Sequence, residues 1–165
     1  MRLFIAIEFE KRIIDSLKQV QTALKKAGLR GRYTREENLH LTLAFIGEYG
    51  EPEKVLKAMS EVPIGECSID IEGLGRFGNL YWIGLKDNPY LIAYVKKLRD
   101  SLDRYGIPYD KKKFSPHITL VRDGISESRA GRMPDTFPKM KMKVSSVALV
   151  KSEYTAKGMK YTVIG

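Results

Sequence analysis

A strand–helix–strand unit occurs twice in this chain and limits the folds that it can adopt. Each unit begins with a short apolar run, continues with apolar residues at helical spacing that end at a glycine, and closes with alternating apolar and polar residues. The segments are residues 3–9, 13–24 and 39–46 in the first unit and 80–85, 88–102 and 117–122 in the second. A shift of 77 residues, the separation of His40 and His117 (117 − 40), superimposes the two units without a gap. We therefore expect a pseudo-symmetric fold in which equivalent strands face a common groove.

The segments outside the two units complete the expected fold. The run 68–74 should pair with 80–85, and Pro52 opens a short helix. Residues 141–151 and 161–164 are expected to be two closing strands, separated by a turn at Lys157-Gly158. Residues 123–138 are rich in Gly, Ser, Asp and Pro, and we expect a surface loop there that can gate a site. Regular alternation in the strand 39–46 gives its inward face four residues, Leu39, Leu41, Leu43 and Phe45.

The bulk composition favours one compact domain over residues 1–165. Hydrophobic residues make up 43% of the chain and charged residues 30%, which is ordinary for a globular protein of this length. Cys67 is the only cysteine, so no internal disulfide can form, as expected in a reducing compartment. The apolar N-terminal run is too short for a secretion signal or a membrane span. We therefore expect a cytoplasmic protein, a monomer, that does not contact membranes.

The charge balance favours an anionic partner. There are 29 Lys and Arg against 20 Asp and Glu, a formal net charge of +9. Long-range attraction then favours RNA, DNA or nucleotides, and a basic surface that serves only solubility is the alternative. Basic residues precede both alternating strands, as Arg30, Arg32 and Arg35 before the first and Lys111–Lys113 before the second. A groove shared by these strands would meet phosphates with positive charge at both ends.

The chain has only two histidines, and each is followed two residues later by a threonine. The pairs are His40 with Thr42 and His117 with Thr119. Residues two apart on a strand project from the same face, so each pair presents an imidazole beside a hydroxyl. A lone strand histidine is more often a structural residue, but two matched pairs at equivalent positions favour a shared function. We interpret these four residues as a candidate catalytic site.

These side chains suit the hydrolysis of a phosphodiester. An imidazole has an ordinary pKa of about 6.5, so a neutral ring can take a proton from water while a protonated ring donates one to the departing oxygen. Threonine hydroxyls can donate hydrogen bonds to the non-bridging oxygens, where negative charge grows. Two His, one Cys and no His-Glu-x-x-His spacing make a catalytic zinc site unexpected. We predict neither a metal nor a cofactor.

Several stretches around these residues resemble the two-histidine (2H) phosphoesterase family. The resemblance is to its LigT-like branch of RNA 2′,3′-cyclic phosphodiesterases, also named 2′-5′ RNA ligases. It covers the chain nearly end to end. The similar stretches are residues 1–7, 37–48 and 114–122, which include both His-x-Thr pairs, and the ending 147–154 and 157–161, with a serine near a strand end, a glycine turn and a tyrosine.

The resemblance implies a bilobed α+β fold with pseudo-twofold symmetry, an antiparallel sheet in each lobe, helices outside and a central groove. It implies that His40 is the general acid, that His117 is the general base, and that Thr42 and Thr119 assist them. The implied reaction opens a terminal 2′,3′-cyclic phosphate of RNA to a 2′-phosphate, without metal or cofactor. The branch also carries an arginine at the place of Arg122, which would bind phosphate. Because Arg122 follows His117 by an odd number of residues, it reaches the groove only if the strand twists or ends there.

The substrate-binding residues and the exact substrate leave alternatives open. We assign substrate contacts to Arg122, Lys111, Lys113, Arg35 and Tyr33. Tyr33, Phe77, Tyr81 and Trp82 are aromatic residues that could stack a terminal base. One alternative is a phosphodiesterase of small cyclic nucleotides such as ADP-ribose cyclic phosphate, and another is a non-catalytic module that binds RNA ends. Ligation of 2′-5′ linkages by the reverse reaction also stays open.

Overall fold

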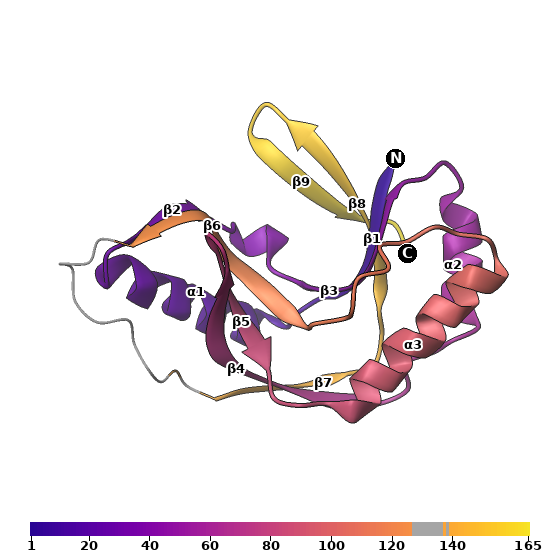
Figure 1. The fold of residues 1–165 in the computed structure, drawn as a ribbon, viewed down its shortest axis with the longest axis horizontal. Helices are drawn as coiled ribbons and strands as arrows, with labels where there is room; N and C mark the ends of the chain where they lie inside the picture. The colour runs from indigo at the N-terminus through magenta and orange to yellow at the C-terminus, as the bar shows by residue number, and fades with distance from the viewer. Residues whose placement is uncertain (127–136, 138) are drawn as a thin grey trace.

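Two antiparallel sheets and three α-helices make up the structure, a computed structural model that describes residues 1–126, 137 and 139–165 (Figure 1). The first sheet has the order β3 (Leu41–Glu48), β1 (Arg2–Ile7), β8 (Ala148–Thr155) and β9 (Gly158–Val163). The second has the order β2 (Leu29–Tyr33), β6 (His117–Ser126), β5 (Leu80–Leu85), β4 (Cys67–Phe77) and β7 (Met140–Val144). The helices are α1 (Lys11–Lys26), α2 (Pro52–Ser60) and α3 (Pro89–Arg104), with a 3₁₀ turn, η1, at Glu36–Asn38. The predicted α+β class is confirmed.

The two sheets repeat one arrangement of strands. In the first sheet, β1 lies between β3 and β8, and β9 lies outside β8. In the second, β5 takes the place of β1, β6 that of β3, β4 that of β8 and β7 that of β9. The strand β2 is added at the outer edge of β6. The predicted pseudo-symmetry of the fold is therefore present in the sheets.

Each long helix covers the sheet of the other half. The helix α1 follows β1 of the first sheet but contacts β2, β6 and β7 of the second, while α3 follows β5 of the second sheet and contacts β3 of the first (Figure 1). The helical stripe predicted for α1 is buried at Ile13, Leu17, Val20 and Leu24. One continuous apolar core contains residues of both sheets and all three helices. The prediction of a single domain over residues 1–165 stays a prediction, and this shared core favours it.

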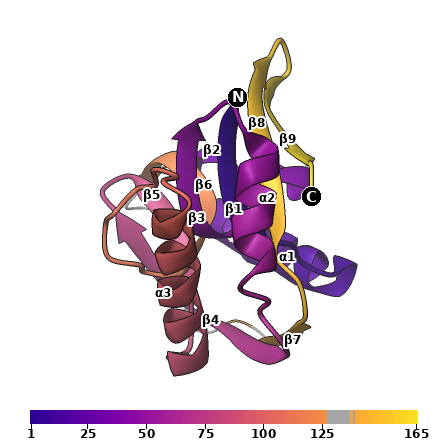
Figure 2. The same cartoon turned by 90° about the vertical axis from the view of Figure 1, so that its right-hand side faces the viewer.

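The ends and contacts of α3 follow from its sequence. The Asn88 side chain accepts a hydrogen bond from the Leu91 backbone N–H at 3.1 Å, and Pro89 occupies the first turn, as predicted. The helices α2 and α3 pack side by side (Figure 2). At their contact the buried Ser101 hydroxyl donates to the carbonyl oxygen of Ala58 at 2.7 Å. No helix in the described residues is long and apolar enough to cross a membrane.

Two predictions outside the duplicated units are wrong. Residues 141–151 are not one strand, because β7 and β8 lie in different sheets and residues 145–147 connect them. The loop predicted from residue 123 begins later, because β6 continues to Ser126. The reason is the strand β2, which the sequence did not indicate and which pairs with this extension, Leu29 lying opposite Ser126. The rest of the predicted loop, residues 127–136 and 138, and its role as a gate lie outside the described residues.

Candidate active site

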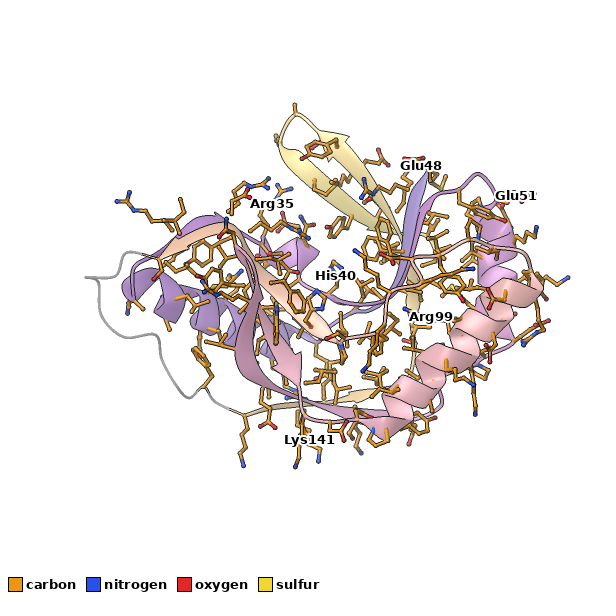
Figure 3. All side chains as sticks on the ribbon, viewed as in Figure 1. Arg35, His40, Glu48, Glu51, Arg99 and Lys141 are labelled. Carbon is orange, nitrogen blue, oxygen red and sulfur yellow. The ribbon has the colours of Figure 1, made fainter. Side chains whose placement is uncertain are left out.

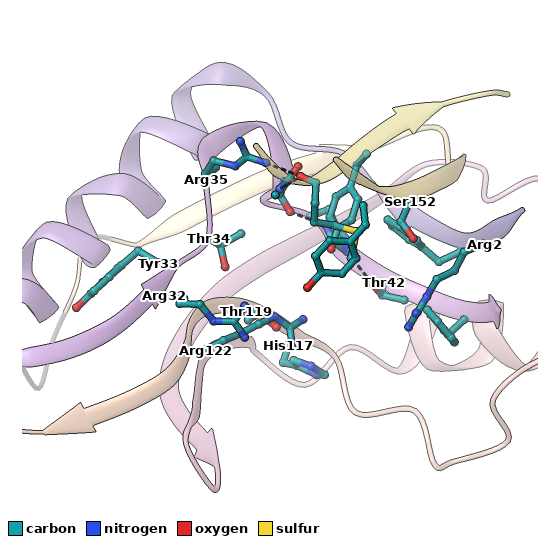
Figure 4. A pocket seen from close by; sticks show the side chains of 18 residues that line it. Arg2, Arg32, Tyr33, Thr34, Arg35, Thr42, His117, Thr119, Arg122 and Ser152 are labelled. Carbon is teal, nitrogen blue, oxygen red and sulfur yellow. Dashed lines mark hydrogen bonds between the residues drawn. The ribbon is translucent and has the colours of Figure 1, made fainter. Parts of the chain in front are cut away.

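Both His-x-Thr pairs line one groove between the two sheets (Figure 4). His40 immediately precedes β3, and His117 is the first residue of β6, the equivalent strand of the second sheet. Thr42 and Thr119 lie along the same strands and also line the groove, which has a volume of about 640 Å³. The four candidate catalytic residues therefore share one cavity.

A hydrogen bond to a backbone carbonyl oxygen fixes each of the two imidazoles in the same way. The Nδ1 atom of His40 lies 2.6 Å from the carbonyl oxygen of Asn38, and that of His117 lies 2.8 Å from the carbonyl oxygen of Ser115. A carbonyl oxygen can only accept, so Nδ1 carries a hydrogen in each ring and Nε2 is left to exchange a proton. The acceptor stands two residues before the histidine in both halves, so the two halves fix the same tautomer of the ring.

Two aromatic rings partly enclose His40. Its ring lies 4.7 Å from that of Phe4 and 5.2 Å, edge-on, from that of Tyr161. Its Nε2 lies 2.8 Å from the Thr42 hydroxyl, which donates to it while the ring is neutral. Burial lowers the pKa of His40, the Asn38 carbonyl opposes this, and the positive charges of Arg122 and His117 lower it further. The second half thus acts electrostatically on the first across the groove.

The surroundings of His117 are more open. Its ring lies edge-on to that of Phe77 at 5.2 Å and 6.2 Å from that of Trp82. Phe77 keeps 49% of its surface exposed. Among the hydrogen bonds of the described residues, none joins the Nε2 atom of His117 to Thr119. The two rings are alike in how they are fixed and unlike in what surrounds them.

A β-bulge in β6 brings Arg122 to the groove. Two consecutive residues of β5 lie opposite Thr119 and Val121, so Leu120 is an extra residue in this ladder. Both Leu120 and Val121 are fully buried, and the alternation of faces restarts after them. Arg122 therefore lines the groove with His117, although regular alternation would turn it inward.

An equivalent bulge in β3 overturns the prediction for Phe45. Two consecutive residues of β1 lie opposite Thr42 and Ala44, so Leu43 is the extra residue, at the position equivalent to the bulge in β6. Leu41 and Leu43 are buried in the core as predicted, but Phe45 lines the groove instead of the inward face. The alternation used for this strand is broken by the bulge.

The predicted substrate contacts separate into two groups. Tyr33 and Arg35 line the groove. The Tyr33 hydroxyl donates to the carbonyl oxygen of Leu29 at 2.6 Å, and the Arg35 guanidinium donates to the carbonyl oxygen of Met159. The lysines Lys111 and Lys113 are exposed on the connection from α3 to β6 and are not among the lining residues. Substrate binding by these four residues stays a prediction.

Further lining residues were not identified as site residues from the sequence. They are Arg2, Phe4, Thr34, Asn38, Ser152, Tyr154, Gly158, Met159 and Tyr161. Arg32, which belongs to the basic stretch expected at one end of the groove, also lines it. The positions 2 and 4 share a face of β1, but a short apolar run does not reveal which face meets a groove. Ser152 and Tyr161 fall in the ending that resembles the LigT-like branch, and this was the available signal for them.

Comparison with known proteins decides the family. The family model described as LigT like Phosphoesterase matches residues 7–81 and 83–161. The chain belongs to this family. Two similar proteins are named RNA 2′,3′-cyclic phosphodiesterase: one from Escherichia coli is 31% identical over 166 residues, and one from Thermotoga maritima is 27% identical over 180 residues. The matches cover 98% and 99% of this chain, and 92% and 93% of the two relatives.

Solved structures of similar proteins have the same fold. The crystal structure of E. coli LigT complexed with 3′-AMP superimposes with a TM-score of 0.81 at 26% identity, covering 99% of this chain and 95% of that one. The crystal structure of TT0787 of Thermus thermophilus gives a TM-score of 0.80 at 26% identity, covering 100% of this chain and 96% of that one. The bilobed fold with a central groove, implied by the resemblance, is confirmed.

Proposed function

We propose that this LigT-like phosphoesterase is an RNA 2′,3′-cyclic phosphodiesterase that leaves a 2′-phosphate. The observation that carries the proposal is the meeting of both His-x-Thr pairs in one groove, each ring with Nδ1 fixed and Nε2 available. The names of the relatives from E. coli and T. maritima support the choice of substrate.

In the proposed reaction the two histidines have opposite roles. His117 takes a proton from water as the water oxygen forms a bond to phosphorus. The bond from phosphorus to O3′ breaks, and His40 donates a proton to that oxygen. The phosphate stays on O2′, and the two rings return to their starting states by exchanging protons with solvent. The proton balance needs no metal or cofactor.

The neighbouring polar groups suit a transition state with growing negative charge. Thr42 and Thr119 present hydroxyls to the groove, and Arg122 presents a planar guanidinium beside them. The lining residues in the described part of the chain include four arginines and no Asp or Glu: Arg2, Arg32, Arg35 and Arg122. This charge favours a polyanionic substrate such as RNA.

The lowered pKa of His40 sets a condition on its role as the acid. In the free protein, burial and the nearby positive charge of Arg122 favour the neutral ring. A bound phosphodiester brings a negative charge next to these groups and stabilises the imidazolium form. We therefore propose that the bound substrate raises the pKa of His40, so that its ring is protonated in the complex and can act as the acid.

The proposed function is tested by one assay with several substrates. An RNA that ends in a 2′,3′-cyclic phosphate and the small alternative, ADP-ribose cyclic phosphate, are each offered to the protein in excess chelator. The position of the phosphate in each product is then determined. We expect opening of the RNA end to a 2′-phosphate.

Each other outcome of this assay contradicts a stated part of the proposal. Turnover of only the small nucleotide would favour the alternative enzyme, and binding of the RNA end without turnover would indicate a non-catalytic module. Loss of turnover in chelator would contradict the reaction without metal. An added RNA with a 5′-hydroxyl end tests for 2′-5′ ligation in the same samples.

A further inference from the structure

Two arginines of the groove lie directly opposite each other on neighbouring strands. Arg32 of β2 is paired with Arg122 of β6 in the ladder that joins these strands. Both side chains line the groove, and Figure 4 shows them beside Thr119 and His117. Like charges at directly opposite positions of a sheet repel each other and lower its stability. Anions bound in this part of the groove would relieve the repulsion.

The backbone beside the pair is unusual. Asp123, which follows Arg122, has a φ of 53°, and no other non-glycine residue of the described chain has a positive φ. This left-handed conformation is tolerated by aspartate better than by most residues, but it still costs free energy, and such residues are concentrated at functional sites. Across the ladder stands Gly31, where the Cβ of any other residue would lie 2.8 Å from the Arg122 carbonyl oxygen. The contact between β2 and β6 is therefore built closely around Arg32.

Asp123 uses this conformation to orient Arg32. Its carboxylate accepts a hydrogen bond from the Nε atom of Arg32 at 2.6 Å. The two side chains keep 69% and 70% of their surface exposed, so this ion pair contributes little to stability. Its main effect is on direction, because Nε is occupied and the two terminal nitrogens are left. Among the hydrogen bonds of the described residues, none uses these two nitrogens, which form a planar fork that fits a phosphate.

The other arginines of the groove have different contacts. The Arg35 guanidinium donates to the carbonyl oxygen of Met159, and that of Arg2 lies over the Phe45 ring at 5.1 Å. Arg32 is therefore the groove arginine whose direction is set by a carboxylate while its terminal nitrogens stay available.

Arg32 lies one strand farther from the imidazoles than Arg122 does. Arg122 shares β6 with His117, whereas Arg32 lies on the edge strand β2, and neighbouring strands are about 4.8 Å apart. In agreement with this order, the charge of Arg122 lowers the pKa of His40 and that of Arg32 does not contribute to the shift. A phosphate between the two imidazoles can thus meet Arg122, and a second phosphate beside it can meet Arg32.

We propose that Arg32, oriented by Asp123, binds a second phosphate of the substrate next to the one on which the histidines act. In an RNA that ends in a 2′,3′-cyclic phosphate, the nearest other phosphate is the one on the 5′ oxygen of the terminal nucleotide. Every RNA end longer than one nucleotide carries it, whereas a nucleoside cyclic phosphate lacks it. The proposal rests on the proposed function and adds to it a means of selecting RNA ends over single nucleosides.

The proposal is tested with two ligands that differ only in the 5′ phosphate. Adenosine 2′-monophosphate and adenosine 2′,5′-bisphosphate are titrated by calorimetry into the wild-type protein, Arg32→Gln and Arg76→Gln. We expect the wild-type protein to bind the bisphosphate about ten-fold more tightly, because a second charge-assisted contact is made. Arg32→Gln should lose most of this advantage and bind the monophosphate as the wild-type protein does, which also shows that its groove is folded. Arg76 is an exposed arginine of β4 (Cys67–Phe77) in the same sheet that does not line the groove, so Arg76→Gln is the matched control and should behave as the wild-type protein does.

Four results would overturn the proposal. Equal affinity of the wild-type protein for the two ligands would mean that no second phosphate is bound. An advantage that Arg32→Gln retains would place the 5′ phosphate elsewhere, and one that Arg76→Gln also loses would make it an effect of net charge. An equal loss of both ligands in Arg32→Gln would assign Arg32 to the first phosphate.

The outcome does not depend on hydrolysis. A protein that shows the expected pattern of binding but fails to open an RNA cyclic phosphate would refute the proposed function alone. A protein that opens the RNA end while Arg32→Gln keeps the full advantage would refute only the second phosphate site.

Discussion

The His40 half and the His117 half of this protein share a backbone plan but differ in their side chains. In both, a carbonyl oxygen two residues upstream fixes the ring, and a bulge turns the fifth following residue into the groove. His40 is enclosed by Phe4 and Tyr161, whereas His117 lies beside the half-exposed Phe77. The duplication therefore determines where the two imidazoles meet, while the local side chains give each ring different surroundings.

The supports of the two bulged strands differ as well. The carbonyl oxygen of Leu120 accepts hydrogen bonds from the Thr34 N–H at 2.9 Å and from the Gln21 side-chain amide at 3.0 Å. Gln21 is a buried residue of α1, the helix that follows β1 of the first sheet but packs against the second sheet. In the corresponding strand β3, the carbonyl oxygen of Phe45 accepts a hydrogen bond from the backbone N–H of Asp110. The position of Arg122 therefore depends on a side chain outside the groove (Figure 3 draws the side chains of the described residues).

The largest expected effect is the removal of either imidazole. We expect His40→Ala and His117→Ala each to lower turnover of an RNA 2′,3′-cyclic phosphate by about 10²–10⁴-fold, because each loses one proton transfer. Circular dichroism serves as the control for folding. If one variant keeps nearly full turnover, the two halves do not act as an acid and base pair.

A smaller effect is expected from the threonines, and it should differ between the halves. Thr42→Val and Thr119→Val should each lower turnover by about 10–10³-fold through the loss of a donor to the phosphate. Thr42 also donates to the Nε2 atom of His40, so only Thr42→Val should shift the pH profile. Equal shifts of the profile in both variants would contradict the unlike surroundings of the two rings.

The bulge in β6 can be weakened from outside the groove. Gln21→Leu removes a donor to the carbonyl oxygens of Leu120 and Thr34, and we expect a loss of about 1–3 kcal/mol in the free energy of unfolding in urea. Because the same bulge aims Arg122, the affinity for inorganic phosphate should fall several-fold. Gln19→Leu, an exposed position on the same helix, is the matched control and should change neither quantity. Unchanged phosphate affinity in Gln21→Leu would show that the support of the bulge by Gln21 does not affect phosphate binding.

The smallest effect concerns protonation of His40 in the free protein. Its pKa should lie below the ordinary value of 6.5 in an NMR titration, and inorganic phosphate should raise it. Since the unfolded chain then binds the proton more readily than the folded protein, stability should be full above the ordinary pKa. It should fall as the pH drops from there through the folded pKa. A titration at or above the ordinary value would contradict the closed surroundings of this ring.

The sequence was sufficient for what depends on local pattern. The apolar stripe of α1, the cap at Asn88 and the two His-x-Thr strands were predicted from periodicity and spacing. The strand β2 was missed because Leu29–Tyr33 holds two arginines and a glycine and is stabilised by its pairing with β6. Phe45 was misplaced, and Arg122 left unplaced, because a bulge is set by the ladder between two strands. Pairing between distant strands, unlike periodicity, cannot be predicted from the sequence of either strand alone.

The central claim, that both imidazoles meet one phosphate, is tested most directly by following the only two histidines of the chain in one titration. Inorganic phosphate is added to ¹⁵N-labelled protein, and the imidazole signals of His40 and His117 are recorded by NMR. We predict that both rings shift together, with a single dissociation constant and one phosphate bound per chain. A response of one ring only, or two separate dissociation constants, would contradict it.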